Sequence, residues 1–224
     1  MSTPSRQSAA AARRKTREQQ ILAATRRLFD ESGVRDAQID DIARAVGINR
    51  AIIYRHFSGK EELFALAVEG YLDELRQRLE TAAADTPGTP ADRLRGVVSA
   101  FVDYGLEYPA FVDCAQTLMR RPGPELLEQV SEGALFRLGR AISSCLRTLQ
   151  ETLDAGIDAG DFKAQDSVLA ANYMYASGLG ALQLARIGLL VKETAPGIPT
   201  ISHVSGEQVK EFLTNSAVAL ATGN

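Results

Sequence analysis

The residues best suited to chemistry stand close together between positions 49 and 60. Arg50 follows Asn49, a residue type that favours the position just before a helix. A guanidinium at the start of a helix can donate two hydrogen bonds to O6 and N7 of guanine. Ala51 is small enough to allow close approach, and Ile52 can contact a thymine methyl group. This segment therefore predicts contacts with base edges in a major groove.

Donors suited to phosphate follow in the same segment, namely Tyr54, His56 and Lys60. Lys60 opens the next helix, whose unpaired N–H groups also favour an anion. For His56 the alternative is packing against that helix. A basic arm earlier in the chain can reach an adjacent groove or the phosphate backbone, or it is a solvated tail; it consists of Arg13, Arg14, Lys15 and Arg17.

Two short helices joined by a tight turn would position these side chains. The apolar period predicts a helix that Gly47 ends and a second one that starts after Asn49 and carries Ile52, Ile53 and Phe57. Ala43 is small, as a close helix crossing requires, and glycine tolerates the left-handed backbone of a turn. This is helix-turn-helix geometry, with a small core formed by Ile42, Val46, Ile48 and Ile53.

The segment resembles the signature of the TetR family of transcriptional regulators. The resemblance covers about residues 15–66 and is carried by Ile42-Ala43, by Gly47-Ile48-Asn49 and by the run from Tyr54 to Leu63 (YRHFSGKEEL). Three positions depart from the family pattern. Gln38 stands where a Thr or Ser usually caps the helix and contacts phosphate, Asn49 replaces a Ser, and Ile52 replaces a Thr, Ser or Ala. The last departure leaves the operator sequence open.

The resemblance implies a homodimer that binds double-stranded DNA at a palindromic operator. It also implies a repressor that is released when a small-molecule effector binds in the C-terminal domain, and an interface formed by the last two long helices. Small residues on one helix face suit such an interface, or else packing within the chain: Ser177, Ala181, Ala185 and Gly188. Candidate effector contacts, which are otherwise ordinary core, are Tyr104, Phe111, Met119, Phe136 and Tyr173.

The charge of the chain is unevenly distributed. Residues 1–56 contain 11 Lys and Arg against 6 Asp and Glu, a net charge of +5, whereas the remainder contains 14 against 22, a net charge of −8. A basic head on an acidic body fits a nucleic-acid partner for the head. Only two cysteines are present, which excludes a disulfide scaffold. Cys114 and Cys145 fall on apolar stripes and are expected to be inert buried thiols.

Elsewhere the apolar period is helical, which predicts an all-α fold of about nine helices without a sheet. We expect a flexible tail over residues 1–12, a DNA-binding domain over 13–60 and a helical effector-binding and dimerisation domain over 61–224. Residues 167–185 carry no charge, but their polar side chains favour a buried helix, ending near Val191, over a membrane span. A loop over 194–204 then precedes the last helix. We expect a cytoplasmic protein.

The sequence contains few of the motifs that are typical of enzymes or of metal-binding and cofactor-binding proteins. The chain has two histidines and lacks a Glu-x-x-His pair, a Cys-x-x-Cys pair, a P-loop and a dinucleotide fingerprint. We therefore expect no enzymatic activity, no cofactor and no metal. Two alternatives stay open: a DNA-binding regulator without a small-molecule switch, and a helical interaction module that binds no DNA. A cavity ligand that changes DNA affinity would exclude the first, and duplex binding would exclude the second.

Overall fold

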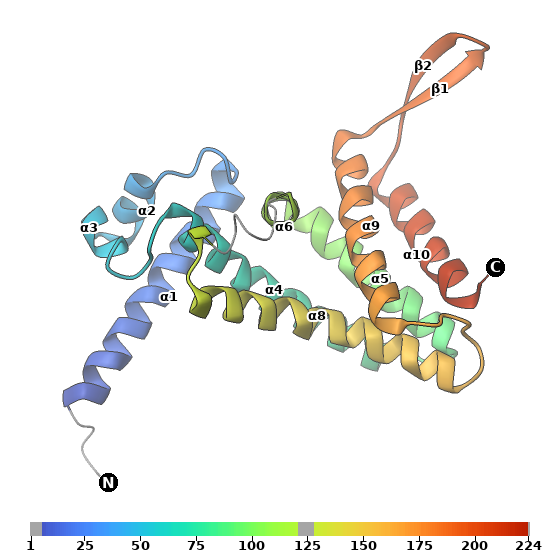
Figure 1. The fold of residues 1–224 in the computed structure, drawn as a ribbon. Coiled ribbons are helices and arrows are strands. Elements are labelled where there is room, and N and C mark those ends of the chain that lie inside the picture. Colours follow the sequence, from blue (N-terminus) through green and yellow to red (C-terminus); the bar gives the residue numbers. More distant parts are fainter. Residues whose placement is uncertain (1–5, 121–127, 224) are drawn as a thin grey trace. The chain divides into compact units, whose positions relative to one another are not determined.

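The computed structural model describes residues 6–120 and 128–223 (Figure 1). Within these ranges the chain forms nine helices and a two-stranded sheet, so the predicted helical architecture is confirmed and a hairpin is added to it. The helices are α1 (Arg6–Ser32), α2 (Ile39–Val46), α3 (Arg50–Ile53), α4 (Lys60–Asp85), α5 (Pro90–Glu107), α6 (Pro109–Met119), α8 (Glu132–Asp158), α9 (Ser167–Ile187) and α10 (Gly206–Thr222), and the strands are β1 (Leu189–Ala195) and β2 (Ile198–His203).

The chain divides into two compact units. The first comprises residues 1–71 and 117–139, and the second comprises 72–116 and 140–224. The expected domain boundary at residue 60 falls inside the first unit. Helix α4 is continuous through Tyr71 and contributes to both units.

The core of the first unit forms beneath α1, α2 and α3. Ile21 and Phe29 of α1 are buried together with Ile42 and Ile53 of the short helices. The ring of Phe29 meets that of Phe64 edge-on, with 4.8 Å between centroids. The predicted small core therefore exists around Ile42 and Ile53, while Val46 and Ile48 are only half-buried.

Three local predictions about this unit need correction. Helix α1 begins at Arg6, so residues 6–12 are helical rather than a flexible tail, because alanine, arginine and glutamine are strong helix formers. Helix α3 ends at Ile53 and not at Phe57. The spacing of Ser58 and Glu61 in the sequence predicts a capping box, but the carboxylate that accepts from the backbone N–H of Ser58, at 2.7 Å, is that of Glu62.

The second unit is built around α5, α9 and α10, and α10 packs against both of the others. Thr89 and Asp92 form a capping box at the start of α5, with Pro90 in the first turn. A Cβ atom on Gly105 would lie 2.3 Å from Leu182 Cδ1, so the close approach of α5 to α9 requires glycine there. No described helix is long and apolar enough to cross a membrane.

The predicted helix to Val191 and the predicted loop over 194–204 are wrong. Helix α9 ends at Ile187, and Gly188 follows in the left-handed conformation with φ 69°. The next residues form the antiparallel hairpin of β1 and β2, in which Val191 pairs with Ile201. Pro196 and Gly197 connect the strands, a pair of residue types typical of tight turns. The hairpin projects beyond α9 and α10 (Figure 1).

Candidate nucleic-acid interface

The start of α3 presents an arginine to the surface. The side chain of Arg50 is 67% exposed, and its Nη1 lies 3.8 Å from Oδ1 of Asp40, which is itself 65% exposed. Such an exposed pair contributes little stability, so another anion or a base edge can replace it at low cost. Ala51 beside it is exposed, and Ile52 is half-buried. The short helix thus offers one long donor next to a small residue.

Two polar residues, Gln38 and Asn49, directly precede the short helices, and only one of them caps its helix with its side chain. Asn49 caps α3, because its Oδ1 accepts from the N–H of Ala51 at 2.9 Å. Gln38 occupies the equivalent position before α2 but makes no side-chain cap. Its Nε2 reaches the carbonyl oxygen of Asp36 at 3.4 Å, and the side chain is exposed. The amide of Gln38 is therefore the more readily redirected towards a ligand.

Basic residues of α1 lie within electrostatic reach of the segment after α3. The pKa of His56 is lowered from 6.5, first by burial and then by the charge of Arg14, with Glu18 opposing and Arg17 adding to the effect. The imidazole is therefore mainly neutral at pH 7. The basic arm is a helix rather than an extended tail, and Arg13, Arg14 and Lys15 are exposed on it. The fold thus brings α1 arginines near His56.

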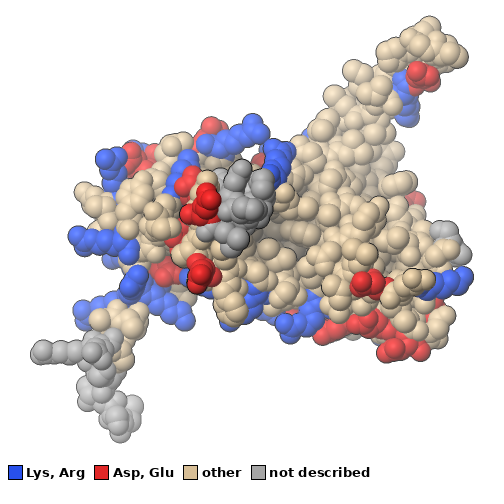
Figure 2. Space-filling view, viewed as in Figure 1, with Lys and Arg blue, Asp and Glu red and all other residues tan. Residues whose placement is uncertain are grey.

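The remaining phosphate candidates stand on either side of His56. Tyr54 is 53% exposed just after α3. Lys60 is the first residue of α4, and its Nζ lies 4.9 Å from the centre of the Phe64 ring. Figure 2 shows Lys and Arg side chains projecting from the surface around α1, α2 and α3. The candidate DNA-contacting residues all belong to the first unit.

A buried carboxylate supports this region, and sequence reasoning missed it. Glu62 is 7% exposed and accepts hydrogen bonds from Ser58 and from Ser131, whose hydroxyl lies 2.7 Å from Oε1. Burial raises the pKa of Glu62, but the hydrogen bonds from both serines, helped by Arg137, outweigh it and lower the pKa overall. Ser131 also caps α8 through the N–H of Ala134. Glu62 therefore joins the starts of α4 and α8.

Arg137 of α8 makes the second such link. Its guanidinium pairs with Glu69 of α4 at 2.6 Å and also with Glu18 of α1. These residues lie far apart in the sequence, since Glu18 and Arg137 are separated by 119 positions along the chain. Single-sequence patterns record only local spacing, so no signal was available to find this cluster. Within the described residues, no group of three metal-ligating side chains occurs.

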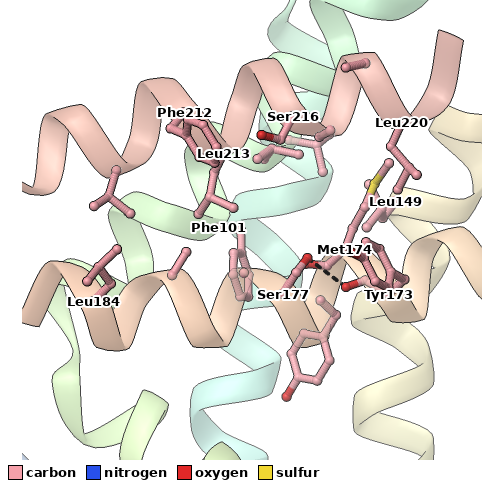
Figure 3. Close-up of a pocket in the computed structure, with 18 of the residues that line it drawn as sticks. Phe101, Leu149, Tyr173, Met174, Ser177, Leu184, Phe212, Leu213, Ser216 and Leu220 are labelled. Atoms are coloured by element: carbon pink, nitrogen blue, oxygen red, sulfur yellow. Dashed lines mark hydrogen bonds between the residues drawn. The ribbon is translucent and has the colours of Figure 1, made fainter. Parts of the chain in front are cut away.

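The second unit contains a cavity of about 890 Å³ between α4, α5, α8, α9 and α10 (Figure 3). Of the five aromatic and methionine candidates, only Tyr173 lines it. Tyr104 and Phe111 are fully buried against each other, with ring centroids 5.4 Å apart, whereas Met119 and Phe136 are exposed on the first unit. A helical period identifies a buried face but not whether a void lies beneath it.

The small-residue face of α9 is divided between two environments. Ser177 and Ala181 line the cavity, Ala185 is half-buried, and Gly188 ends the helix. The exposed side of α9 carries a different stripe, at intervals of three or four residues, formed by Leu169, Tyr173, Ala176, Gly180, Leu184 and Ile187. An exposed apolar stripe with small residues at its centre suits a second helix.

Comparison with known proteins finds a family match within the first unit. Residues 21–67 match the family described as "Bacterial regulatory proteins, tetR family". The transcriptional activator FasR of Mycolicibacterium smegmatis is 33% identical over 91 residues, which are 41% of each chain. The transcriptional repressor KstR2 of Mycobacterium tuberculosis is 30% identical over 111 residues, covering 48% of this chain and 55% of that protein. The chain thus spans about half the length of these curated relatives.

Among solved structures, the crystal structure of RolR in complex with resorcinol covers 94% of this chain and 90% of that one. The two share 18% identity at a TM-score of 0.67. At this identity the similarity shows only that the two chains share a fold. The shared fold covers nearly the whole of this chain.

Proposed function

Since the chain belongs to the TetR family, we propose that it is a DNA-binding transcriptional regulator whose first unit reads an operator. The observation that carries the proposal is the exposed Arg50 at the start of α3, with His56 and the α1 arginines close to the same segment. Arg50 donates to guanine, and Ala51 and Ile52 approach the neighbouring bases. Asn49 shapes the helix start, and Gln38 contacts phosphate beside it.

The phosphate contacts come from both sides of the recognition helix. Tyr54, His56 and Lys60 follow it, and the basic helix of α1 supplies Arg13, Arg14, Lys15 and Arg17. Contacts of this kind fix the register of a protein on the duplex, while the base contacts specify sequence. A regulator of this type binds strongly at low salt and more weakly as salt rises.

The regulator acts as a homodimer through α9 and α10. Their exposed apolar residues support this assignment, above all Leu169 and Tyr173 of α9 and Phe212 of α10, which is 72% exposed. Two copies of the first unit then bind half-sites of a palindrome about 34–36 Å apart, or a multiple of that distance.

A small molecule in the cavity of the second unit releases the operator, which makes the protein a ligand-responsive repressor. Leu75 and Leu79 of α4 line the cavity, and Lys60 begins the same helix. A ligand that shifts α4 therefore alters the spacing of the two reading units. Allosteric coupling of about 1–3 kcal/mol changes operator affinity by roughly 5–150-fold, which is sufficient for regulation. The solved relative RolR carries resorcinol, which supports a small-molecule effector.

Selection of bound fragments from genomic DNA tests the proposal. We expect palindromic fragments to be enriched by the unaltered chain and lost with Arg50→Ala. The purified protein should behave as a dimer and shift an enriched fragment in a gel. If it binds no duplex even at low ionic strength, the chain is a helical interaction module instead. If it binds DNA and no cavity ligand changes the affinity, it is a regulator without a small-molecule switch.

A further inference from the structure

We propose that the cavity of the second unit selects an uncharged, mainly hydrocarbon molecule and rejects a carboxylate of the same length. The inference deepens the proposed function, because it names the chemical class of the effector. It depends on the character of the cavity wall, on the protonation states of its titratable groups, and on where its polar atoms lie.

The inner wall of the cavity is closely packed hydrocarbon. Leu75 and Leu79 of α4, Val97 of α5, Leu149 of α8 and Val209 of α10 each line it and are at most 9% exposed. A cavity of about 890 Å³ lies within the range of roughly 300–1,000 Å³ that holds drug-sized ligands. The favourable contribution of such a wall comes from apolar ligand surface removed from water.

The described residues that line the cavity include no Lys, Arg, Asp, Glu or His. Three lining side chains can titrate, namely Cys145, Tyr173 and Tyr175, and none of them is a cation in either protonation state. Burial raises the pKa of the Cys145 thiol to about 12, and its Sγ lies 3.1 Å from the carbonyl oxygen of Leu72. Burial likewise raises the pKa of the Tyr175 phenol. An ionised ligand group would therefore lose water without gaining a counter-charge, which is strongly unfavourable.

Besides the Tyr175 phenol, the polar side chains that line the cavity are those of Tyr173, Ser177, Gln208 and Ser216. Tyr173 is 61% exposed and Ser216 is exposed, so these two side chains lie on the solvent-facing side of the cavity. Figure 3 shows Tyr173 on α9 and Ser216 on α10. Ser177 instead donates its hydroxyl hydrogen to the carbonyl oxygen of Tyr173 at 2.8 Å. A hydroxyl or carbonyl at one end of the ligand can meet Tyr173 and Ser216 while the hydrocarbon end points inward. A carboxylate at the same end would give up part of its hydration and meet no cation among the lining residues.

Backbone packing sets the shape of the wall beside these residues. A Cβ atom on Gly178 would lie 2.7 Å from Cε1 of Phe101, so the glycine lets this ring lie against α9. The rings of Phe101 and Tyr175 meet edge-on at 6.0 Å. Aromatic edges and aliphatic side chains together form a surface suited to an alkyl or ring system without charge.

Displacement of an uncharged dye tests the inference on the whole chain without DNA. N-phenyl-1-naphthylamine fluoresces in apolar surroundings, and we expect it to bind with about one dye per chain. We expect 1-decanol to displace it at pH 8, and decanoate to be about tenfold weaker or worse, because its carboxylate finds no partner. Equal displacement by decanoate, or an absence of dye binding, would overturn the proposal.

Two neighbouring substitutions localise the dye. Ser216 lines the cavity and Asn215 does not, and both are exposed on α10, so neither substitution disturbs the core of a single chain. Because α10 also belongs to the proposed dimer interface, the two variants are compared at equal oligomeric state, measured by light scattering. We expect Ser216→Trp to weaken dye binding about fivefold or more by occupying the opening, and Asn215→Trp to leave it within about twofold. Equal binding by the two variants would place the dye elsewhere and contradict the assignment.

The same reagents test the ligand class of the cavity and the proposed regulatory function separately. Displacement by 1-decanol concerns the cavity alone, whereas a gel shift with and without 1-decanol concerns the operator. If 1-decanol binds and the operator complex is unchanged, the ligand class stands and ligand-released repression falls. If decanoate and not 1-decanol binds and releases DNA, the proposed function stands and the ligand class is wrong.

Discussion

The hydroxyl of Ser131 donates to Glu62 across 2.7 Å, so the residue that caps α8 is tied to the carboxylate at the start of α4. Glu62 also holds the backbone N–H of Ser58, the residue directly after the short helices and Phe57. The region that presents Arg50 and Lys60 is therefore supported by a carboxylate that does not itself reach the surface.

Glu62→Gln should lower the free energy of unfolding at pH 7 by about 1–3 kcal/mol, because buried hydrogen bonds to a charged group are weakened. The pKa of Glu62 is lowered from 4.5 in the folded chain, so its stabilisation is present above about pH 4.5 and is lost as pH falls further. Urea denaturation from pH 7 down to about pH 3 measures both effects. Glu61→Gln is the matched control and should leave the pH dependence unchanged.

Arg50→Ala should weaken binding to the selected operator by about 1–3 kcal/mol per half-site and relax the preference at one base pair. The reason is the loss of the donor pair aimed at guanine. Fluorescence anisotropy with the operator and with single-base variants measures this. Arg55→Ala, which removes an exposed charge just after α3, should weaken all sequences alike. A uniform loss with Arg50→Ala would remove it from base reading.

Lys60→Ala should weaken binding to every duplex and reduce the slope of log affinity against log salt by about 0.9 for each phosphate that is no longer neutralised. The ammonium releases a counterion from DNA when it binds phosphate. Titrations at several salt concentrations give the slope. An unchanged slope would mean that Lys60, which lies against the Phe64 ring, does not leave it for phosphate.

His56→Gln should remove a pH dependence of operator affinity. The pKa of His56 is lowered in the chain, mainly by burial, so the imidazole is mostly neutral before DNA binds. A nearby phosphate favours the charged form, so binding takes up a proton and affinity rises as pH falls from about 8 to about 6. Dissociation constants measured at both ends of that range test this. Equal pH dependence in the variant would assign His56 to packing.

Gly180→Arg should convert the dimer to monomers. Gly180 is exposed on α9, and a Cβ atom there meets nothing within 4 Å, so the folded monomer accommodates the new side chain. A partner helix in close contact would not. Light scattering across a concentration series measures the mass. Gly139→Arg on α8 is equally open and serves as the control. An intact dimer would place the interface away from this stripe.

The sequence by itself determined the helix-turn-helix. Its core residues Ile42 and Ile53, the turn at Gly47 and the Asn49 cap are all local, within 12 positions of one another, and the structure contains each of them. Helix periods elsewhere were recognisable for the same reason, since an apolar period reports on a single helix. The hairpin was missed because the apolar residues after Gly188 continue a pattern that also suits a buried helix.

Only the tertiary structure decided which distant residues meet. The pairing of Arg137 with Glu18 and Glu69, the bond between Ser131 and Glu62, and the cavity that excludes Tyr104 and Phe111 all depend on how helices pack. A sequence specifies which face of a helix is apolar, but the void left between five such faces depends on their crossing angles and separations. Local sequence patterns were therefore sufficient to find the recognition helix α3. The residues that support it and the cavity that fits a ligand follow only from how the helices pack.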